Sequence, residues 1–280
     1  MSVMAKLQGL VVPSSPVTIS PGPATLLSFE TEPDDGTSLV DLSPAPVVAL
    51  YDAFGNAATN ADGTVTVTVT SGPLGGSLVG TGAVSISGGT ATFDAIAFDV
   101  ATANGGQDYV LTATTDAGSA NPIASASFEI AAGPPSAVVF TTQPSGGAAA
   151  SIWAKQPVIR LEDQVGNLVA GSGASVSVAL NAGIGPLNGN VGPLSLDTGT
   201  ASFANLGLDT AQADASLITV TTGVSVAEAV SGDFDITVGA PAGLVPNVAS
   251  TTTTGGVPLD PVRSFECDCR GWLHCPFFPA

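Results

Sequence analysis

The chain contains one block of about 110 residues twice. Three segments of the first copy recur in the second, and in each pair most residue types are kept. The matched segments are residues 46–56 with 157–167, 89–93 with 199–203, and 128–130 with 234–236, at offsets of 157 − 46 = 111, 199 − 89 = 110 and 234 − 128 = 106. The falling offset indicates short deletions in loops of the second copy. A period this long is typical of an independent domain rather than a solenoid repeat, so the sequence predicts two similar domains.

Short alternating runs of apolar and polar residues dominate each copy. With 34 Gly and 21 Pro in 280 residues, the chain is interrupted too often for long helices. The alternation has the period of two that a half-buried strand requires. About seven short strands per copy, separated by turn residues, predict an all-β fold of two antiparallel sandwiches. The clearest runs are residues 65–70 and 174–180, 84–86 and 194–196, and 109–114 and 217–221.

Charge restricts the partners of the protein. The chain has 23 acidic and 5 basic residues, a net charge of −18, although only 10% of its residues are charged. Such a surface repels phosphate backbones and anionic lipids, which excludes nucleic acid as a partner and argues against membrane binding. No apolar run reaches the roughly 18–20 residues of a membrane-spanning helix, and residues 1–13 lack the continuous apolar stretch of a secretory signal. We therefore expect a soluble protein made in the cytoplasm, without membrane insertion.

The repeats and the composition together predict the order of domains. Pro- and Ser-rich residues begin the chain, and the prolines between the two copies limit the hinge there. The last segment lacks a core pattern at first and then becomes rich in aromatic residues and cysteine. The predicted parts are an extended arm over 1–22, a first sandwich over 23–131, a linker over 132–135, a second sandwich over 136–238 and a tail over 239–280.

Three motifs recur within residues 23–238. The first is a strand that ends in Thr-x-Pro, as in residues 140–144. The second is Pro-Val-(x)3-Tyr/Glu-Asp-(x)2-Gly-Asn, and the third is Gly-Thr-Ala-Thr/Ser-Phe. With these motifs the repeated unit resembles the tandem bacterial immunoglobulin-like repeats of the invasin-like group, which occur on surface proteins and on phage particles. The resemblance implies immunoglobulin-like sandwiches that act as stalks, spacers or binding heads, and it brings no shared catalytic residue.

The second motif supplies the most regular candidate site of the two copies. Its Asp can accept bonds from backbone N–H groups, and its Gly and Asn tolerate a positive φ, so a tight turn is the expected structure. One or two acidic residues per site are too few for Ca²⁺, which takes six to eight oxygen ligands. A further acidic group, residues 30–35, is either a cation site or a solvated loop, and we favour the loop. The predicted turn residues are Asp52, Gly55, Asn56, Asp163, Gly166 and Asn167.

The tail carries the most reactive side chains. Cys267, Cys269, His274 and Cys275 are ligand types that Zn²⁺ prefers, although their spacing is not a usual one. A metal site, a disulfide or intermolecular link, and free thiols in an apolar segment all remain open. Large apolar residues gather around them and would be poorly placed in water, which predicts docking on a partner. These predicted docking residues are Phe265, Trp272, Leu273, Phe277 and Phe278.

Catalysis has few residues to draw on. The only histidine lies in the tail, which excludes a Ser-His-Asp arrangement within either sandwich. Lys6 and Lys155 are the only lysines, and neither belongs to a phosphate-binding loop. The sequence therefore predicts a protein that is not an enzyme and has no cofactor or resident metal.

Three functions compete for such a protein. The first is a phage virion accessory protein, most simply a capsid decoration protein on the virion surface. It is motivated by a chain that starts at Met without an export signal and has end segments able to bind capsid subunits. The second is an adhesin, filament or S-layer component on a bacterial cell surface, bound to other lattice subunits or to copies of itself. The third is a module that binds a host-surface glycan, which would need an exposed aromatic ring. Trp153 is the one tryptophan of the sandwiches, and we expect it to pack in the core or between the domains instead.

Overall fold

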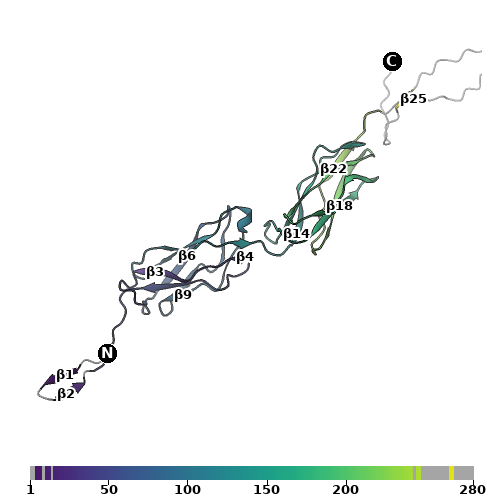
Figure 1. Cartoon of the computed structure of the whole chain (residues 1–280). Coiled ribbons are helices and arrows are strands. Elements are labelled where there is room, and N and C mark those ends of the chain that lie inside the picture. The colour runs from purple at the N-terminus through teal and green to yellow at the C-terminus, as the bar shows by residue number, and fades with distance from the viewer. Residues whose placement is uncertain (1–3, 8–9, 14, 242–243, 247–264, 268–280) are drawn as a thin grey trace, which may run out of the picture. The chain divides into compact units, whose positions relative to one another are not determined.

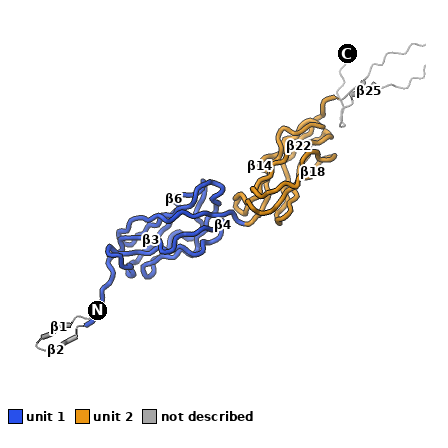
Figure 2. The backbone as a smooth tube through the Cα atoms, viewed as in Figure 1, with its two compact units in different colours: residues 1–133 blue, residues 134–280 orange. Residues whose placement is uncertain are grey.

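The computed structural model describes residues 4–7, 10–13, 15–241, 244–246 and 265–267 (Figure 1). By its internal contacts the chain divides into two compact units between Gly133 and Pro134, within the predicted linker (Figure 2). Strands form nearly all the regular structure of the described residues, and one 3-10 turn, η1 (Thr102–Asn104), interrupts them.

Two sheets build the first unit. One is three-stranded, in the order β3-β5-β9, and the other is four-stranded, in the order β12-β11-β6-β8. All pairs within these two sheets are antiparallel. Their strands are β3 (Leu26–Thr31), β5 (Val47–Tyr51), β9 (Thr90–Thr92), β12 (Ile123–Ala124), β11 (Val110–Thr115), β6 (Thr64–Ser71) and β8 (Ala83–Ser85).

Two short pairs complete the first unit. The antiparallel pair is β7 (Leu78–Gly80) with β10 (Ile96–Phe98). The parallel pair is β4 (Gly36–Thr37) with β13 (Ile130–Ala131), and it joins the beginning of the unit to its end. Gly36 N donates to Glu129 O at 2.9 Å beside this pair. The contact helps to close the sandwich, because it joins two segments that lie 94 residues apart in the sequence (130 − 36).

The core of the first unit follows from the alternation of its strands. In β6, Val65 and Val67 are buried in the core. Thr68, the next residue, points to the opposite face of the sheet and is exposed, as a period of two requires. Phe98, Tyr109 and Phe128 form an aromatic cluster, with ring centroids 4.5 Å apart for Phe98 and Tyr109 and 5.3 Å for Phe98 and Phe128. Such offset and edge contacts add to the burial of the rings themselves.

The second unit repeats this plan. A sheet in the order β14-β17-β21 corresponds to β3-β5-β9, and a five-stranded sheet runs in the order β15-β24-β23-β18-β20. The third sheet is β16-β22-β19. Their strands are β14 (Ala137–Thr142), β17 (Val158–Glu162), β21 (Thr200–Ser202), β15 (Gly147–Ala148), β24 (Phe234–Thr237), β23 (Gln212–Thr222), β18 (Ser175–Ala182), β20 (Leu194–Ser195), β16 (Ser151–Ile152), β22 (Ala204–Leu208) and β19 (Leu187–Asn190). The predicted fold class, all-β with two tandem immunoglobulin-like sandwiches, is confirmed.

Trp153 anchors the core of the second unit. It is 2% exposed, and its ring lies 4.8 Å from the ring of Phe234 in an edge-on contact. The corresponding position of the first unit, 153 − 111 = 42, is Leu42, which is also buried. Among the described residues of the second unit there is no aromatic cluster like that around Tyr109, since the equivalent position, 109 + 106 = 215, is Ala215. The two cores therefore share a frame but are filled by different side chains.

Regular structure also lies in both end segments. Within residues 1–22, the predicted extended arm, β1 (Met4–Leu7) pairs antiparallel with β2 (Leu10–Pro13). The apolar run Leu10-Val11-Val12 favours a strand, which outweighs the neighbouring prolines. In the predicted tail, β25 (Leu244–Pro246) pairs antiparallel with β26 (Phe265–Cys267). Strand segments thus precede and follow the two sandwiches in the sequence.

Candidate functional site

The turn after β5 is built around the carboxylate of Asp52. Its Oδ1 accepts hydrogen bonds from Phe54 N at 2.9 Å and Asn56 N at 3.0 Å. Its Oδ2 accepts from Gly22 N at 2.9 Å, and the side-chain amide of Asn56 donates to it at 3.1 Å. Gly55 takes a φ of +80° between them, which a side chain would oppose. The turn therefore fastens the residues that lead into the first sandwich to the end of β5.

These donors also set the acidity of Asp52. The side-chain amide of Asn56, followed by the backbone N–H groups of Gly22 and Asn56, stabilises the charged carboxylate and lowers the pKa of Asp52 from 3.8 to about 2. Asp52 is 2% exposed in the folded chain, so these bonds replace water around its charge. The residue is ionised throughout the neutral range and acts there as an acceptor, not as a general acid or base.

The turn after β17 has the same construction. Asp163 Oδ1 accepts from Val165 N at 3.0 Å and Asn167 N at 2.8 Å, and the amide of Asn167 donates to Oδ2 at 2.8 Å. Asp163 and Asn167 are both buried. Gly166 takes a φ of +88°, and its carbonyl accepts a bond from the guanidinium of Arg160 at 2.9 Å. Both copies of the motif thus form turns whose polar groups bond to each other.

The arrangement of donors decides what these turns can bind. A cation would have to displace N–H groups that already point at the carboxylate oxygens, and each turn contributes only one carboxylate. Calcium and magnesium both need several free oxygen ligands. Within the described part of the chain, no group of three or more His, Cys, Asp or Glu side chains is close enough together to hold a metal ion. The turns are best described as structural clamps.

The acidic group of the first unit has a similar role. Glu32 Oε2 accepts from Ala126 N at 3.0 Å, and Asp35 Oδ1 accepts from Glu129 N at 2.7 Å. The hydroxyl of Tyr51 donates to Glu30 at 2.5 Å. Two of these bonds connect the start of the unit to the segment just before its last strand, beside the β4–β13 pair. The sequence pattern did not reveal this role, because the partners lie more than 90 residues away.

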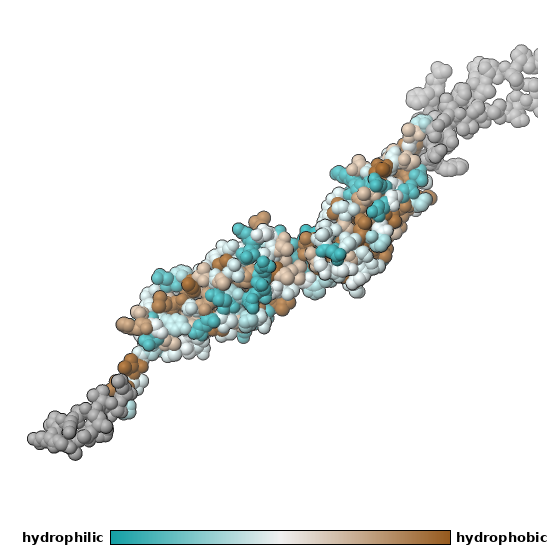
Figure 3. Space-filling model, in the orientation of Figure 1, coloured by the Kyte–Doolittle hydropathy of each residue, from teal (hydrophilic) through white to brown (hydrophobic). Residues whose placement is uncertain are grey.

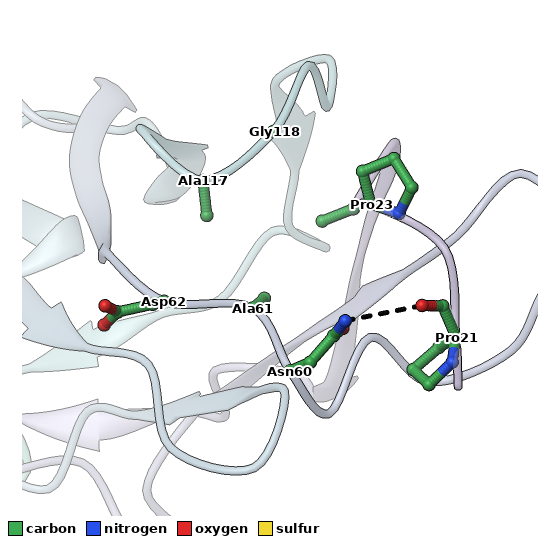
Figure 4. A pocket seen from close by; sticks show the side chains of 8 residues that line it. Pro21, Pro23, Asn60, Ala61, Asp62, Ala117 and Gly118 are labelled. Carbon is green, nitrogen blue, oxygen red and sulfur yellow. Dashed lines mark hydrogen bonds between the residues drawn. The ribbon is translucent and has the colours of Figure 1, made fainter. Parts of the chain in front are cut away.

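One open hollow of about 410 Å³ lies at the start of the first unit (Figure 4). Asn60 borders it, and its side-chain amide donates to Pro21 O at 3.4 Å. Asp62 is the one ionisable side chain in its lining. The remaining lining residues offer small apolar side chains and prolines; they are Pro21, Pro23, Ala24, Ala61, Ala117 and Gly118. Such a lining provides no set of converging polar groups for catalysis.

Exposed apolar residues recur at the same loop positions of both units. Phe54 is 90% exposed, and Val165, at 54 + 111, is also exposed. Leu74 is 97% exposed, and Ile184, at 74 + 110, is exposed as well. On the visible faces of both units, apolar residues are otherwise interspersed with polar ones (Figure 3). Each turn built around an Asp thus holds one apolar side chain out into solvent.

The structure places the other expected site residues as follows. Phe265 begins β26, while Trp272, Leu273, Phe277 and Phe278 lie outside the described residues, as do Cys269, His274 and Cys275. Trp153 belongs to the core of the second unit and offers no exposed ring face for a glycan. No helix in the described ranges has the length and apolar character needed to span a bilayer.

Comparison with known proteins gives distant structural likenesses. No protein-family model matches the chain, and no curated protein matches its sequence. The chain is similar to FdeC, an Escherichia coli adhesin, at 17% identity and a TM-score of 0.36, over 82% of this chain and 72% of that one.

Two further structures are similar in the same way. A chimeric titin Z1Z2 tandem has 15% identity and a TM-score of 0.22, over 76% of this chain and 100% of that one. The Ig1-2 module of the Drosophila receptor tyrosine phosphatase DLAR has 9% identity and a TM-score of 0.19, over 76% and 98% of the two chains. At such low values, the description of this chain rests on its own strands and contacts, which are those of two tandem immunoglobulin-like sandwiches.

Proposed function

We propose that this chain is a non-enzymatic structural protein that holds interaction segments away from the surface that carries it. One observation supports this most directly: the polar residues of its most regular motif are used to build the fold. The carboxylates of Asp52 and Asp163 accept hydrogen bonds from backbone N–H groups of the turns that follow them. A catalytic or metal-binding site would instead leave such groups directed at a ligand.

The partners we propose are other proteins. The net charge of −18 disfavours nucleic acid and anionic lipid. The exposed side chains of Phe54 and Leu74 offer apolar contacts on loops, where binding residues are commonly found. Buried apolar area contributes about 25 cal/mol per Å² before the cost of ordering the partners. A few such anchors support association without an extensive apolar surface.

As the specific carrier we propose a phage capsid, on which the protein would be a decoration protein. The proposed contacts with capsid subunits are the large apolar residues of the C-terminal segment, Phe265, Trp272, Leu273, Phe277 and Phe278. A bacterial cell surface, with the chain as part of an adhesin or a stalk, is the second candidate. The repetition of the sandwich favours it, since tandem units increase reach.

Deletion of residues 264–280 tests the capsid assignment. We expect the number of copies bound per purified particle to fall at least tenfold, with both sandwiches still folded by circular dichroism. The matched control removes residues 1–13 and should leave occupancy unchanged. Equal occupancy after the C-terminal deletion would exclude this segment as the anchor. Absence of the protein from purified particles, together with antibody labelling of intact cells, would replace the capsid by the cell surface.

A further inference from the structure

The residues that lead into each sandwich follow one pattern, which also occurs where the second sandwich ends. Residues 17–23 read VTISPGP, residues 128–134 read FEIAAGP and residues 234–240 read FDITVGA. In each segment an apolar residue, one intervening residue, Ile and two further residues precede Gly. The three glycines are 133 − 22 = 111 and 239 − 133 = 106 residues apart, which are the offsets of the repeat itself.

In the two sandwiches this pattern belongs to the end of the unit. Phe128 and Ile130 are 2% and 1% exposed, and Phe234 and Ile236 are buried likewise. The same positions before the first sandwich are Val17 and Ile19, which are 62% and 86% exposed. The chain thus carries residues typical of a buried last strand at a place where no described unit buries them.

The hairpin upstream of Val17 agrees with this comparison. In the first sandwich, β11 pairs antiparallel with β12, and β12 ends nine residues before the linker glycine (133 − 124 = 9). At the start of the chain, β1 pairs antiparallel with β2, and β2 also ends nine residues before its glycine (22 − 13 = 9). In both places a hairpin is therefore followed first by the apolar-x-Ile motif and then by the glycine.

The strands after Gly239 match the opposite end of a repeat. A first strand begins 26 − 22 = 4 residues after Gly22, 137 − 133 = 4 after Gly133 and 244 − 239 = 5 after Gly239. Each of these first strands pairs antiparallel with a strand farther along the chain. The pairs are β3 with β5, β14 with β17 and β25 with β26. A Pro-Val pair stands at the start of that partner or shortly before it each time, and its Pro is 24, 24 and 22 residues after the glycine (46 − 22, 157 − 133 and 261 − 239).

We propose that β1, β2 and the residues around Ile19 are the last strands of a preceding immunoglobulin-like repeat, and that β25 and β26 are the first two strands of a following one. The chain then comprises two whole repeats flanked by parts of two others, and its linkers are the regular junctions of an array. The exposed Val17 and Ile19 are core positions of the preceding repeat. The proposal goes beyond the proposed function and does not depend on the carrier, but it assigns Phe265 to a strand of the following repeat instead of to a docking segment.

Completion of the preceding repeat tests the first half. Residues 23–108, which hold the earlier strands of the first sandwich, are fused in front of residue 2 of the full chain, with the three native cysteines changed to serine. Thiol labelling of V17C and I19C should slow at least tenfold relative to the unfused chain. T18C is the matched control, because it takes the exposed position of Glu129 and should label at the same rate in both.

Completion of the following repeat tests the second half. Residues 168–238 are joined directly after residue 272, and amide exchange is followed in peptides that contain β25 and β26. Exchange should slow at least 100-fold relative to a chain that ends at residue 272, because an isolated two-stranded sheet is marginal alone and a whole sandwich protects it.

Each fusion is repeated with a segment from the other sandwich as the donor of the added residues. This distinguishes poor packing of one added segment from a wrong assignment of the strands. The alternatives are residues 134–214 at the front and residues 57–131 at the back, taken from the other sandwich. Protection with either donor supports the assignment at that end. Labelling of V17C and I19C as fast as that of T18C with both front donors overturns the first half, and unchanged exchange with both back donors overturns the second.

Discussion

At the scale of single residues, Asp52 links folding to acidity. Its pKa is lowered from 3.8 to about 2 in the folded chain by the bonds from Asn56 and Gly22. A depressed folded pKa means that the stabilisation is present above the unfolded pKa and is lost as the pH falls from about 4 towards about 2. We expect Asp52→Asn to remove much of this acid-induced loss of stability in the first sandwich. Urea unfolding of the full chain at a series of pH values measures it.

The control for this change is Asp62→Asn, an exposed aspartate of the same unit. It removes the same charge without touching the turn. Asp52→Asn should also weaken the hold on Gly22, because an amide nitrogen placed near Gly22 N would set two donors against each other. An acid titration of stability that is as steep in Asp52→Asn as in the unchanged chain would show that the turn does not carry this linkage.

Tyr109 gives a second residue-scale prediction, at the alkaline end. Burial, followed by the charge of Asp99, raises the pKa of Tyr109 to about 12, and its hydroxyl donates to Val100 O at 2.8 Å. The neutral phenol is the folded form, so its stabilisation is present below about pH 10 and is lost as the pH rises towards about 12. Tyr109→Phe should cost about 1 kcal/mol at neutral pH through the lost hydrogen bond.

The measurement is tyrosinate absorbance alongside unfolding of the first unit. In the unchanged chain, ionisation of Tyr109 and unfolding should occur together above pH 10, and Tyr109→Phe should remove that coupled step. The second tyrosine, Tyr51, bonds to Glu30 at the surface, and Tyr51→Phe serves as the control. Ionisation of Tyr109 near pH 10 with the first unit still folded would contradict its buried, bonded role.

At the scale of the strand, position within the alternation decides the effect of a charge. Val67 is buried in β6 and Thr68 is exposed beside it. An Asp at position 67 would place an unpaired carboxylate in the core, and we expect Val67→Asp to destabilise the first sandwich by more than about 4 kcal/mol. Thr68→Asp should change the free energy of unfolding by about 0.5 kcal/mol or less. Chemical unfolding of both variants checks the pair, and equal losses would contradict the assigned faces.

The same alternation explains which strands could be predicted from the sequence. Val65 to Thr70 shows a regular period of two, and the strand found there, β6, spans Thr64–Ser71. The expected turns at Asp52 and Asp163 rest on residue types with a local role, and the structure has turns at both places. Features that depend on neighbouring residues are the ones that local patterns can indicate.

Long-range pairings could not be predicted in this way. The parallel pair of β4 and β13 has two residues per strand, too few to show any period, and its partners are 94 residues apart (130 − 36). The bond from Ala126 N to Glu32 likewise depends on how the sandwich closes. The hairpin of β1 and β2 was missed because Pro13 and the nearby prolines outweighed three apolar residues in the sequence pattern.

At the scale of the whole molecule, each sandwich has its own core. Phe128 packs with Phe98 and Tyr109 in the first unit, and Phe234 packs with Trp153 in the second. Truncation of a buried Phe to Ala typically costs about 3–5 kcal/mol. We expect Phe128→Ala to destabilise the first unit alone and Phe234→Ala to destabilise the second alone, because no residue of either aromatic contact is shared.

Fluorescence can separate the two unfolding steps. With Trp272→Phe as background, Trp153 is the only tryptophan and reports the second unit. Phe234→Ala should lower the urea midpoint of the Trp153 signal, while Phe128→Ala should leave it in place and shift only the remaining circular dichroism change. This independence is expected of domains that each have their own core, since one damaged unit then leaves its neighbour folded. A Trp153 midpoint that falls equally in both variants would mean that the two sandwiches unfold as one body.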